Sequence, residues 1–215
     1  MKLVILDRDG VINIDSVNFI KNINEWTPLP GSLEAIALLN QSGFRVAVAT
    51  NQSGIARGLF DMATLNAIND KMHRALLLVG ARIDALFYCP HSADDNCTCR
   101  KPKTGMIEDI GRRFSVDLSQ VYGVGDSLRD LQAFAGAGCK PILVRSGKGE
   151  ETLANVELAN LSPDNQSLTD QSMPKQSMPK QSLPNLSLPN LSLPTGTLIF
   201  ADLNEAVQHI IAETE

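Results

Sequence analysis

The sequence predicts a doubly wound (Rossmann-like) α/β protein, a three-layer sandwich in which helices cover both faces of a central parallel sheet. Short apolar runs alternate along the chain with longer segments of helical periodicity. This alternation is typical of βαβ units joined by right-handed crossovers. The apolar runs are uninterrupted, as in strands that are buried on both faces. With 215 residues, the chain is long enough to form one well-buried domain.

The strands and helices are expected in a regular order. Strands are expected at 3–6, 44–49, 83–88, 121–124, 141–144 and 197–200. Helices are expected at 31–42, 61–79, 105–114, 128–137 and 202–212. The first helix is expected to end at Gly43, a residue type that favours helix termini. Residues 13–30 show little periodicity and are expected to form a loop.

The composition changes at Ser162. From there to Ser192 serine recurs every five residues, and proline fills the third position in five of the seven units. Proline excludes a regular helix and removes donors from a sheet. We therefore expect residues 162–196 to be a disordered or polyproline-like insertion. It would separate the main part of the domain, 1–161, from the last strand and helix of the same domain, 197–215.

The composition limits the partners of this protein. There are 24 acidic and 19 basic residues, giving a net charge of −5, so the chain lacks the electrostatic footprint of a protein that binds nucleic acid or an anionic membrane. No apolar run approaches membrane-spanning length, and the amino terminus lacks a signal-peptide pattern. We expect a cytoplasmic monomer without nucleic-acid or membrane partners.

Polar side chains follow four of the predicted strands. They are Asp7 and Asp9 after the first strand, Thr50 and Asn51 after the second, Arg100 and Lys101 after the third, and Asp126 to Asp130 after the fourth. A parallel sheet places these strand ends along one edge, where ligands bind. Carboxylates suit Mg²⁺, and lysine, arginine and hydroxyl donors suit phosphate oxygens. Together they predict phosphoryl transfer.

The first of these strand ends carries the pair Asp7 and Asp9. Because side chains alternate along an extended chain, both should point to one side and Arg8 to the other. Two neighbouring carboxylates repel each other unless a cation or a proton lies between them. The alternative is a surface Asp-x-Asp-Gly turn, with Thr50 as a simple turn cap and Lys101 as a solvated residue.

These motifs, in this order over residues 1 to about 150, resemble the four motifs of the haloacid dehalogenase superfamily. The resemblance implies that Asp7 is the nucleophile that forms an aspartyl-phosphate. Asp9 would act as general acid and then as general base. Asp7, the backbone carbonyl of Asp9 and Asp126 would bind Mg²⁺, and Asp130 would lie behind these ligands. Thr50 and Lys101 would bind the phosphoryl oxygens.

Three cysteines and a histidine crowd into one short loop: Cys89, His91, Cys97 and Cys99. In a reducing compartment such crowding indicates metal in place of disulfides. Three cysteines with one histidine form a standard tetrahedral Zn²⁺ set, and filling all four positions implies a structural site that orders the loop. The alternative is a loop with incidental thiols. Cys139, outside this loop, is expected to be a buried small apolar residue.

This loop, continuing into Arg100-Lys101-Pro102, narrows the resemblance to one branch of the superfamily. That branch contains the D-glycero-D-manno-heptose 1,7-bisphosphate phosphatases and the histidinol-phosphate phosphatases. Residues 50–58 and 88–91 resemble the heptose enzymes, whereas the short zinc loop is closer in length to the histidinol enzymes. We favour a small phosphorylated sugar, the heptose bisphosphate, hydrolysed at its C7 phosphate on the route to ADP-heptose and lipopolysaccharide core.

The same resemblance implies a set of substrate contacts: Asp15, Asn18, Asn51, Ser53, Arg100 and Ser127. Arg57 and Arg129 are further cations available to a second phosphate. Ser127 replaces the lysine of some relatives, which places its contact in question. No insertion large enough for a cap domain lies between the motifs, so the site should be open.

Two functions from other classes remain as alternatives. A non-catalytic phosphoacceptor of the receiver type also places aspartates, Mg²⁺ and a lysine on a parallel-sheet edge, but it gives Asp9 no role. A zinc-containing interaction module with a decayed site is the second alternative, and the intact set of aspartates argues against it.

Overall fold

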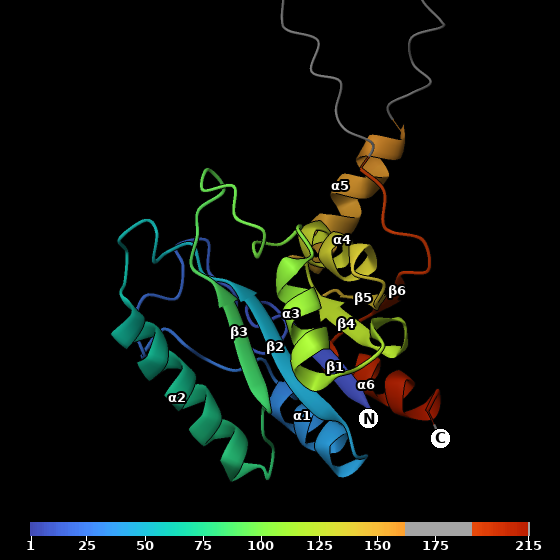
Figure 1. Ribbon diagram of the computed structural model, residues 1–215, viewed down its shortest axis with the longest axis horizontal. Helices are drawn as coiled ribbons and strands as arrows, with labels where there is room; N and C mark the ends of the chain where they lie inside the picture. The colour runs from blue at the N-terminus through green and yellow to red at the C-terminus, as the bar shows by residue number, and fades with distance from the viewer. Residues whose placement is uncertain (162–190, 215) are drawn as a thin grey trace, which may run out of the picture.

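The computed structural model describes residues 1–161 and 191–214, and in it one parallel sheet forms the centre of the fold (Figure 1). Its six strands lie in the order β3-β2-β1-β4-β5-β6. The strands are β1 (Leu3–Leu6), β2 (Arg45–Asn51), β3 (Ala85–Cys89), β4 (Tyr122–Gly125), β5 (Lys140–Val144) and β6 (Leu198–Phe200). Every neighbouring pair is parallel. The doubly wound fold predicted from the sequence is therefore confirmed.

Helices cover both faces of this sheet. They are α1 (Ser32–Gln41), α2 (Met62–Leu78), α3 (Gly105–Phe114), α4 (Leu128–Gly136), α5 (Gly149–Leu161) and α6 (Leu203–Ala212), with a short 3₁₀ turn, η1 (Leu118–Gln120). Apolar residues of α1, α2 and α6 form one core cluster with Val4 and Leu6 of β1. Residues of α3 and α4 form a second cluster with Leu3 and Ile5. Alternate residues of β1 thus enter opposite layers, as expected of a strand buried on both faces.

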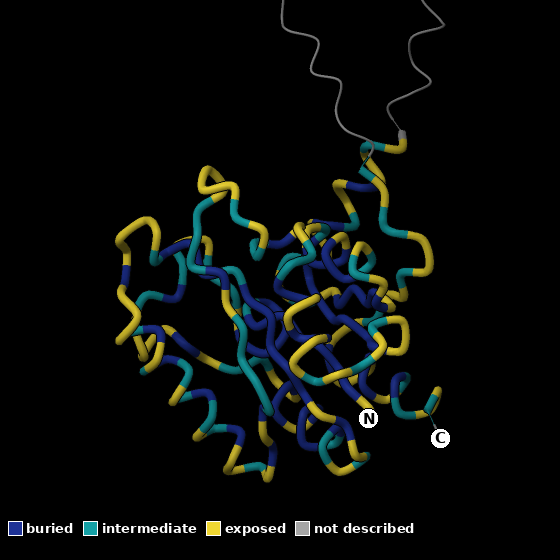
Figure 2. Tube along the Cα trace, viewed as in Figure 1, coloured by how far each residue is buried: buried dark blue, intermediate teal, exposed yellow. Residues whose placement is uncertain are grey.

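The central strands are the most deeply buried part of the molecule (Figure 2). All four residues of β1 are buried, and β1 pairs with β2 on one side and with β4 on the other. The chain therefore leaves β1 in one direction for β2 and β3, and returns to its other side for β4. In such a sheet the crevice at the carboxyl ends of the strands, where the order reverses, is the usual ligand site.

The predicted elements agree with the structure apart from one helix. Each predicted strand and helix lies within a few residues of an observed one, and α3 matches its predicted bounds. Helix α5 was not predicted, because Gly149, Thr152 and Val156 are its only buried residues over 149–160, where burial is described, and it has no apolar stripe. Of the predicted insertion at 162–196, residues 162–190 lie outside the described part of the chain.

The last strand joins the main sheet. Strand β6 pairs with β5, with Ile142 opposite Leu198, and α6 packs in the same layer as α1. Among the described residues, no helix is long and apolar enough to cross a membrane.

Candidate active site

A cavity of about 280 Å³ opens at the carboxyl ends of the central strands. It brings together most of the site residues predicted from the sequence: Asp7, Asp9, Asp15, Thr50, Asn51, Ser53, Arg100, Lys101, Asp126 and Ser127 line its wall. Asn18 does not line the cavity, and its side chain is exposed. The strand-end argument therefore located the site.

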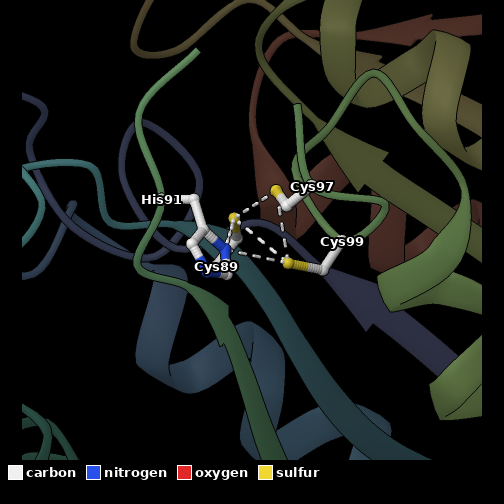
Figure 3. A group of neighbouring side chains, drawn as sticks. All are labelled: Cys89, His91, Cys97 and Cys99. Atoms are coloured by element: carbon white, nitrogen blue, oxygen red, sulfur yellow. Dashed lines mark hydrogen bonds between the residues drawn. The ribbon is translucent and has the colours of Figure 1, made fainter. Parts of the chain in front are cut away.

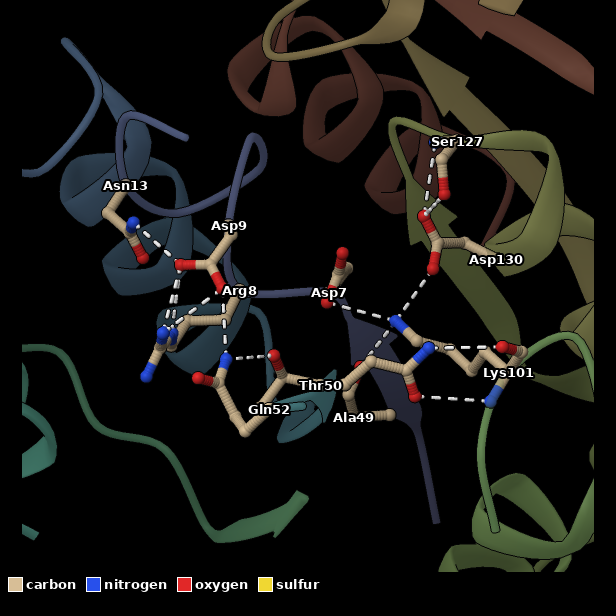
Figure 4. Close-up of polar contacts among 11 residues, drawn as sticks. Asp7, Arg8, Asp9, Asn13, Ala49, Thr50, Gln52, Lys101, Ser127 and Asp130 are labelled. Atoms are coloured by element: carbon tan, nitrogen blue, oxygen red, sulfur yellow. Dashed lines mark hydrogen bonds and ion pairs between the residues drawn. The ribbon is translucent and has the colours of Figure 1, made fainter. Parts of the chain in front are cut away.

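Lys101 lies at the centre of this cavity and is almost fully buried. Its Nζ lies 2.9 Å from Asp7 Oδ1 and 2.7 Å from Asp130 Oδ1, and it donates to the carbonyl oxygen of Ala49 at 2.7 Å (Figure 4). Three oxygens thus lie within 3 Å of the ammonium nitrogen. Burial would lower the pKa of Lys101, but Asp130 and Asp7 outweigh it and raise that pKa. The lysine is a fixed positive charge beside Asp7.

Three carboxylates lie close together in this cavity. Asp7, Asp126 and Asp130 each place an oxygen within 4.8 Å of the others. Burial raises the pKa of Asp7 to about 7 despite the opposing charge of Lys101. Burial, then the charges of Asp7 and Asp130, raises the pKa of Asp126 to about 8. One lysine therefore does not neutralise the cluster, and oxygen donors with surplus negative charge suit a hard divalent cation.

Of these three residues, Asp130 is the least available to a metal. Its Oδ1 faces Lys101, while its Oδ2 accepts from the Ser127 backbone N–H at 3.1 Å and from the Ser127 hydroxyl. These contacts form the amino-terminal cap of α4. Among the described residues the Asp126 carboxylate accepts one hydrogen bond, at Oδ2 from the Lys148 N–H at 2.8 Å, and its Oδ1 accepts none. These contacts leave Asp126 freer than Asp130 to bind a cation.

Two glycines make room for the Asp126 carboxylate. A Cβ on Gly10 would lie 2.0 Å from Asp126 Oδ2, and one on Gly147 would lie 2.2 Å from the same atom. Both glycines have positive φ, 84° and 60° respectively. Their backbones can approach the carboxylate only because they carry no side chain.

Asp9 lies on the other side of Asp7 from Lys101 in the view of Figure 4 and is held by a separate network. Its Oδ1 accepts from Arg8 Nε at 3.1 Å and from Asn13 Nδ2 at 2.9 Å, and its Oδ2 accepts from Gln52 Nε2 at 2.9 Å. Burial would raise the pKa of Asp9, but the Arg8 charge and these hydrogen bonds lower it. The expectation that Arg8 points away from Asp9 was wrong. Strand β1 ends at Leu6, so the alternation of side chains does not continue to Arg8.

Thr50 and Asn51 end strand β2 and Ser53 follows it, and the three residues have different contacts. The Thr50 hydroxyl accepts from Gln52 Nε2 at 2.8 Å and faces the cavity. Asn51 uses its amide on the backbone of Lys101, donating to its carbonyl at 3.0 Å and accepting from its N–H at 3.1 Å. Asn51 therefore fixes the chain that carries Lys101. Ser53 is buried in the cavity wall.

The outer wall of the cavity is rich in cations. Arg57, Arg100, Arg129 and Lys148 line it. Lys148 Nζ lies 2.7 Å from Asp15 Oδ2, which links the loop after β1 to the loop after β5. Arg100 donates to the carbonyl oxygen of His91 at 3.2 Å. These side chains offer the cavity positive charge in addition to that of Lys101.

The four predicted zinc ligands converge in the loop after β3 (Figure 3). The three sulfur–sulfur distances are 3.6 Å for Cys89–Cys97, 3.3 Å for Cys89–Cys99 and 3.5 Å for Cys97–Cys99. His91 Nδ1 lies 3.5 Å from the sulfur of Cys89 and 3.4 Å from that of Cys99. Sulfurs at zinc-bond length around a tetrahedron are about 3.8 Å apart. The donor set therefore fits Zn²⁺ with only a slight expansion.

Several residues of the site were not found from the sequence. Arg8, Asn13 and Gln52 were given no role, and Lys148 was overlooked. For Lys148 a signal existed, because it follows β5 closely and the strand-end argument used for the other strands applies there as well.

Comparison with known proteins identifies the class. Residues 6–138 match the family model of the haloacid dehalogenase-like hydrolases. The chain therefore belongs to the haloacid dehalogenase-like hydrolases.

Closer relatives narrow this class. The D-glycero-beta-D-manno-heptose-1,7-bisphosphate 7-phosphatase of Bordetella bronchiseptica is 64% identical over 154 residues, which cover 72% of this chain and 86% of that protein. The protein of the same name from Pseudomonas aeruginosa is 53% identical over 151 residues, covering 70% of this chain and 85% of that protein. Within its class the chain belongs to the family of these phosphatases.

Solved structures of heptose bisphosphate phosphatases are similar to this chain over its whole length. The crystal structure of D,D-heptose 1,7-bisphosphate phosphatase from B. bronchiseptica, complexed with magnesium and phosphate, has a TM-score of 0.81 at 50% identity and covers 99% of both chains. The phosphatase of the same name from Burkholderia thailandensis has a TM-score of 0.66 at 42% identity, again covering 99% of both chains.

Proposed function

We propose that this chain removes the C7 phosphate from D-glycero-β-D-manno-heptose 1,7-bisphosphate, a precursor of ADP-heptose, through an aspartyl-phosphate on Asp7. The observation that carries the proposal is the placement of Asp7. Its carboxylate lines the cavity and lies 2.9 Å from the buried ammonium of Lys101. The names of the relatives support the choice of substrate.

The residues of the cavity supply each step. The Asp7 carboxylate attacks phosphorus, and the sugar alkoxide leaves with a proton from Asp9, which takes up that proton when the negative charge of the bound phosphate opposes the lowering of its pKa by Arg8. Asp9 then takes a proton from water as the water attacks the aspartyl-phosphate, which releases inorganic phosphate and regenerates Asp7. Lys101 and the Thr50 hydroxyl bind the phosphoryl oxygens and oppose their charge.

Asp7, Asp126 and the backbone carbonyl of Asp9 would hold Mg²⁺. The raised pKa values of Asp7 and Asp126 support this site, because burial and then the neighbouring carboxylates disfavour the free anions, which a bound cation would stabilise. The B. bronchiseptica phosphatase, solved with magnesium and phosphate, supports it as well. When bound, Mg²⁺ neutralises charge on the phosphoryl group.

The second phosphate of the substrate would be bound by the cations of the outer wall. Arg57, Arg100, Arg129 and Lys148 line the cavity together with Asp7. Guanidinium groups suit phosphate because they bind two oxygens at once. Asp15 and Ser53 would contact the sugar and the phosphate side of the cavity. The hydroxyl of Ser127 is already bonded to Asp130 and would contribute through that cap.

We propose a structural Zn²⁺ at Cys89, His91, Cys97 and Cys99. The convergence of their four ligand atoms supports it. The site would set the position of Arg100, which follows Cys99 and donates to the carbonyl of His91.

We further propose that the enzyme is a cytoplasmic monomer, with the 162–196 segment as an insertion near the end of one domain. The four cysteines form no disulfide, which fits a reducing compartment. Size-exclusion chromatography with light scattering tests the monomer.

The function is tested by phosphate release from three esters in the presence of Mg²⁺: heptose 1,7-bisphosphate, its monophosphate product and histidinol phosphate. We expect turnover of the bisphosphate to exceed the other two clearly. Preference for histidinol phosphate would reassign the substrate, and no release from any ester would refute the phosphatase.

The nucleophile is tested by Asp7→Asn. This change should lower kcat by at least about 10³-fold because an amide cannot form the intermediate. Asp109→Asn, at an exposed carboxylate of α3, is the matched control and should keep full activity. Retained activity in Asp7→Asn would remove Asp7 from the nucleophilic role.

A further inference from the structure

Arg8 is a fully buried cation that does not line the cavity. Its side chain is 1% exposed, whereas that of Asp9 is 21% exposed and faces the cavity. Arg8 therefore lies behind Asp9 and cannot reach a bound substrate. A buried guanidinium is stable only if its charge and donors are satisfied.

Asp9 satisfies most of this requirement. Arg8 Nε donates to Asp9 Oδ1 at 3.1 Å, and Arg8 NH2 lies 3.0 Å from both carboxylate oxygens. The remaining contact is longer, from Arg8 NH1 to Asn69 Oδ1 of α2 at 3.4 Å. A planar guanidinium bonded to both oxygens fixes the plane of a carboxylate, which a single donor does not.

The backbone of Arg8 positions a second donor to Asp9. We call the three residues that bond to the Asp9 carboxylate, Arg8, Asn13 and Gln52, the Asp9 cage. The Arg8 carbonyl accepts from the Ile12 N–H at 2.8 Å and from the Asn13 N–H at 3.2 Å. These bonds close the loop through Gly10 and place Asn13 Nδ2 at 2.9 Å from Asp9 Oδ1. Gln52 completes the cage from β2, sharing its amide between Asp9 Oδ2 and the Thr50 hydroxyl.

We propose that Arg8 is a positioning residue that acts through Asp9: it clamps the Asp9 carboxylate at the cavity wall in the orientation needed for proton transfer to the leaving group. This inference rests on the proposed function, in which Asp9 protonates the sugar alkoxide. Loss of Arg8 should lower kcat for esters whose leaving group needs that proton, and it should change KM little. Replacing Arg8 should have no further effect on kcat in a variant whose residue 9 cannot carry a proton.

The test compares an alkyl ester with an aryl ester. An alkyl phosphate such as heptose bisphosphate needs a proton on its leaving group, whereas p-nitrophenyl phosphate releases a stable phenolate without one. We expect Arg8→Met to lower kcat for heptose bisphosphate by about 10- to 100-fold, a part of what general acid–base catalysis supplies, with KM changed less than about 3-fold. The burst of p-nitrophenolate, which reports attack by Asp7, should slow less than about 3-fold. Arg8→Lys should recover part of kcat.

A double-mutant cycle separates positioning from folding. Asp9→Asn strands the buried Arg8 charge, whereas Arg8→Met/Asp9→Asn removes both partners and should fold at least as well as Asp9→Asn. In the Asp9→Asn background, Arg8→Met should cause no further loss of kcat. Ser32→Ala, at a buried hydroxyl that holds the same loop through the Ile12 carbonyl, controls for loop disturbance and should leave the ratio of the two esters unchanged.

Failure of the Arg8 inference can be distinguished from failure of the proposed phosphatase function. If wild-type protein releases phosphate but Arg8→Met slows both esters equally, or slows neither, the Arg8 inference is overturned alone. Additive losses in the cycle overturn it as well. If wild-type protein releases no phosphate from any ester, the proposed function fails first.

Discussion

Lys101 and Asp130 form an ion pair with a nitrogen–oxygen distance of 2.7 Å, and their side chains are 1% and 2% exposed. The pair lies beside Asp7, which shares the same ammonium group. Asp130 also caps α4 through Ser127. One carboxylate therefore couples the position of the lysine to the start of a helix.

Replacing this carboxylate should affect stability and turnover together. Asp130→Asn should lower the free energy of unfolding by about 3 kcal/mol, the lower end for a broken buried pair, because Lys101 keeps Asp7 as a partner. It should lower kcat by roughly 10- to 100-fold because Lys101 loses its fixed position. Urea unfolding and phosphate release measure the two effects. Asp109→Asn removes the exposed partner of Arg112 and should change stability by less than about 0.5 kcal/mol. Equal stability of the two variants would contradict the coupling.

Gly10 offers a test of the space around Asp126. Gly10→Ala should weaken Mg²⁺ binding and lower kcat at least about 10-fold, because the new Cβ would displace the Asp126 carboxylate. Gly43→Ala is the matched control, since Gly43 has nearly the same φ, 82° against 84°, but no atom within 4 Å of the added Cβ. Both changes should cost about 1 to 3 kcal/mol of stability for the strained backbone. Isothermal titration with Mg²⁺ and steady-state kinetics distinguish them, and equal activity in the two variants would contradict the crowding.

The raised pKa values of Asp7 and Asp126 predict how stability depends on pH. The folded-state values, about 7 and about 8, lie above the ordinary value of 3.8, so the folded protein binds these protons more tightly than the unfolded chain. The stability that they contribute is full below about pH 3.8 and is lost as pH rises through 7 and 8. The melting temperature of Mg²⁺-free protein should therefore fall from pH 6 to pH 8.

Mg²⁺ should remove this slope, since the cation replaces the protons. The rise in melting temperature on adding Mg²⁺ should be larger at pH 8 than at pH 6. Asp126→Asn should flatten the slope of the metal-free protein. An unchanged slope in that variant would show that Asp126 is not one of the groups that titrate.

Zinc removal tests the role of the cysteine loop. Cys97→Ser should reduce bound zinc from about one ion per chain to nearly none, because one of four ligands is lost. The loop that carries Arg100 should then be cleaved faster by a protease, and KM for the bisphosphate should rise. Cys139→Ser, at a buried cysteine outside the loop, should keep its zinc. Metal analysis and limited proteolysis measure both, and full zinc in Cys97→Ser would contradict the four-ligand site.

Much of the site followed from one rule, that polar residues after parallel strands meet at one edge. That rule placed Asp7, Lys101 and Asp126 in one cavity although they are far apart in the chain. It could not say how each side chain is used. Asn51 and Ser127 were expected to contact substrate, yet their polar groups bond to Lys101 and Asp130.

The role of Arg8 could not be obtained in the same way. It depends on how the chain turns at Gly10, where φ is 84°, and on the bonds that the Arg8 carbonyl makes in that turn. Such a turn breaks the alternation on which the sequence argument relied. Helix α5 was not predicted for a different reason. A helix with so small a buried face has no periodic pattern of apolar residues in its sequence.

The central position of β1 also bears on how the chain folds. Strand β1 is the one that both halves of the sheet need, since β2 and β4 pair with its two edges. Contacts such as Ser146 Oγ to the Gly10 carbonyl join residues 136 positions apart. Topologies dominated by such distant contacts fold slowly, because the chain must close long loops before these contacts form. The catalytic cavity is built from these late contacts, so regain of phosphatase activity during refolding should coincide with completion of the whole sheet.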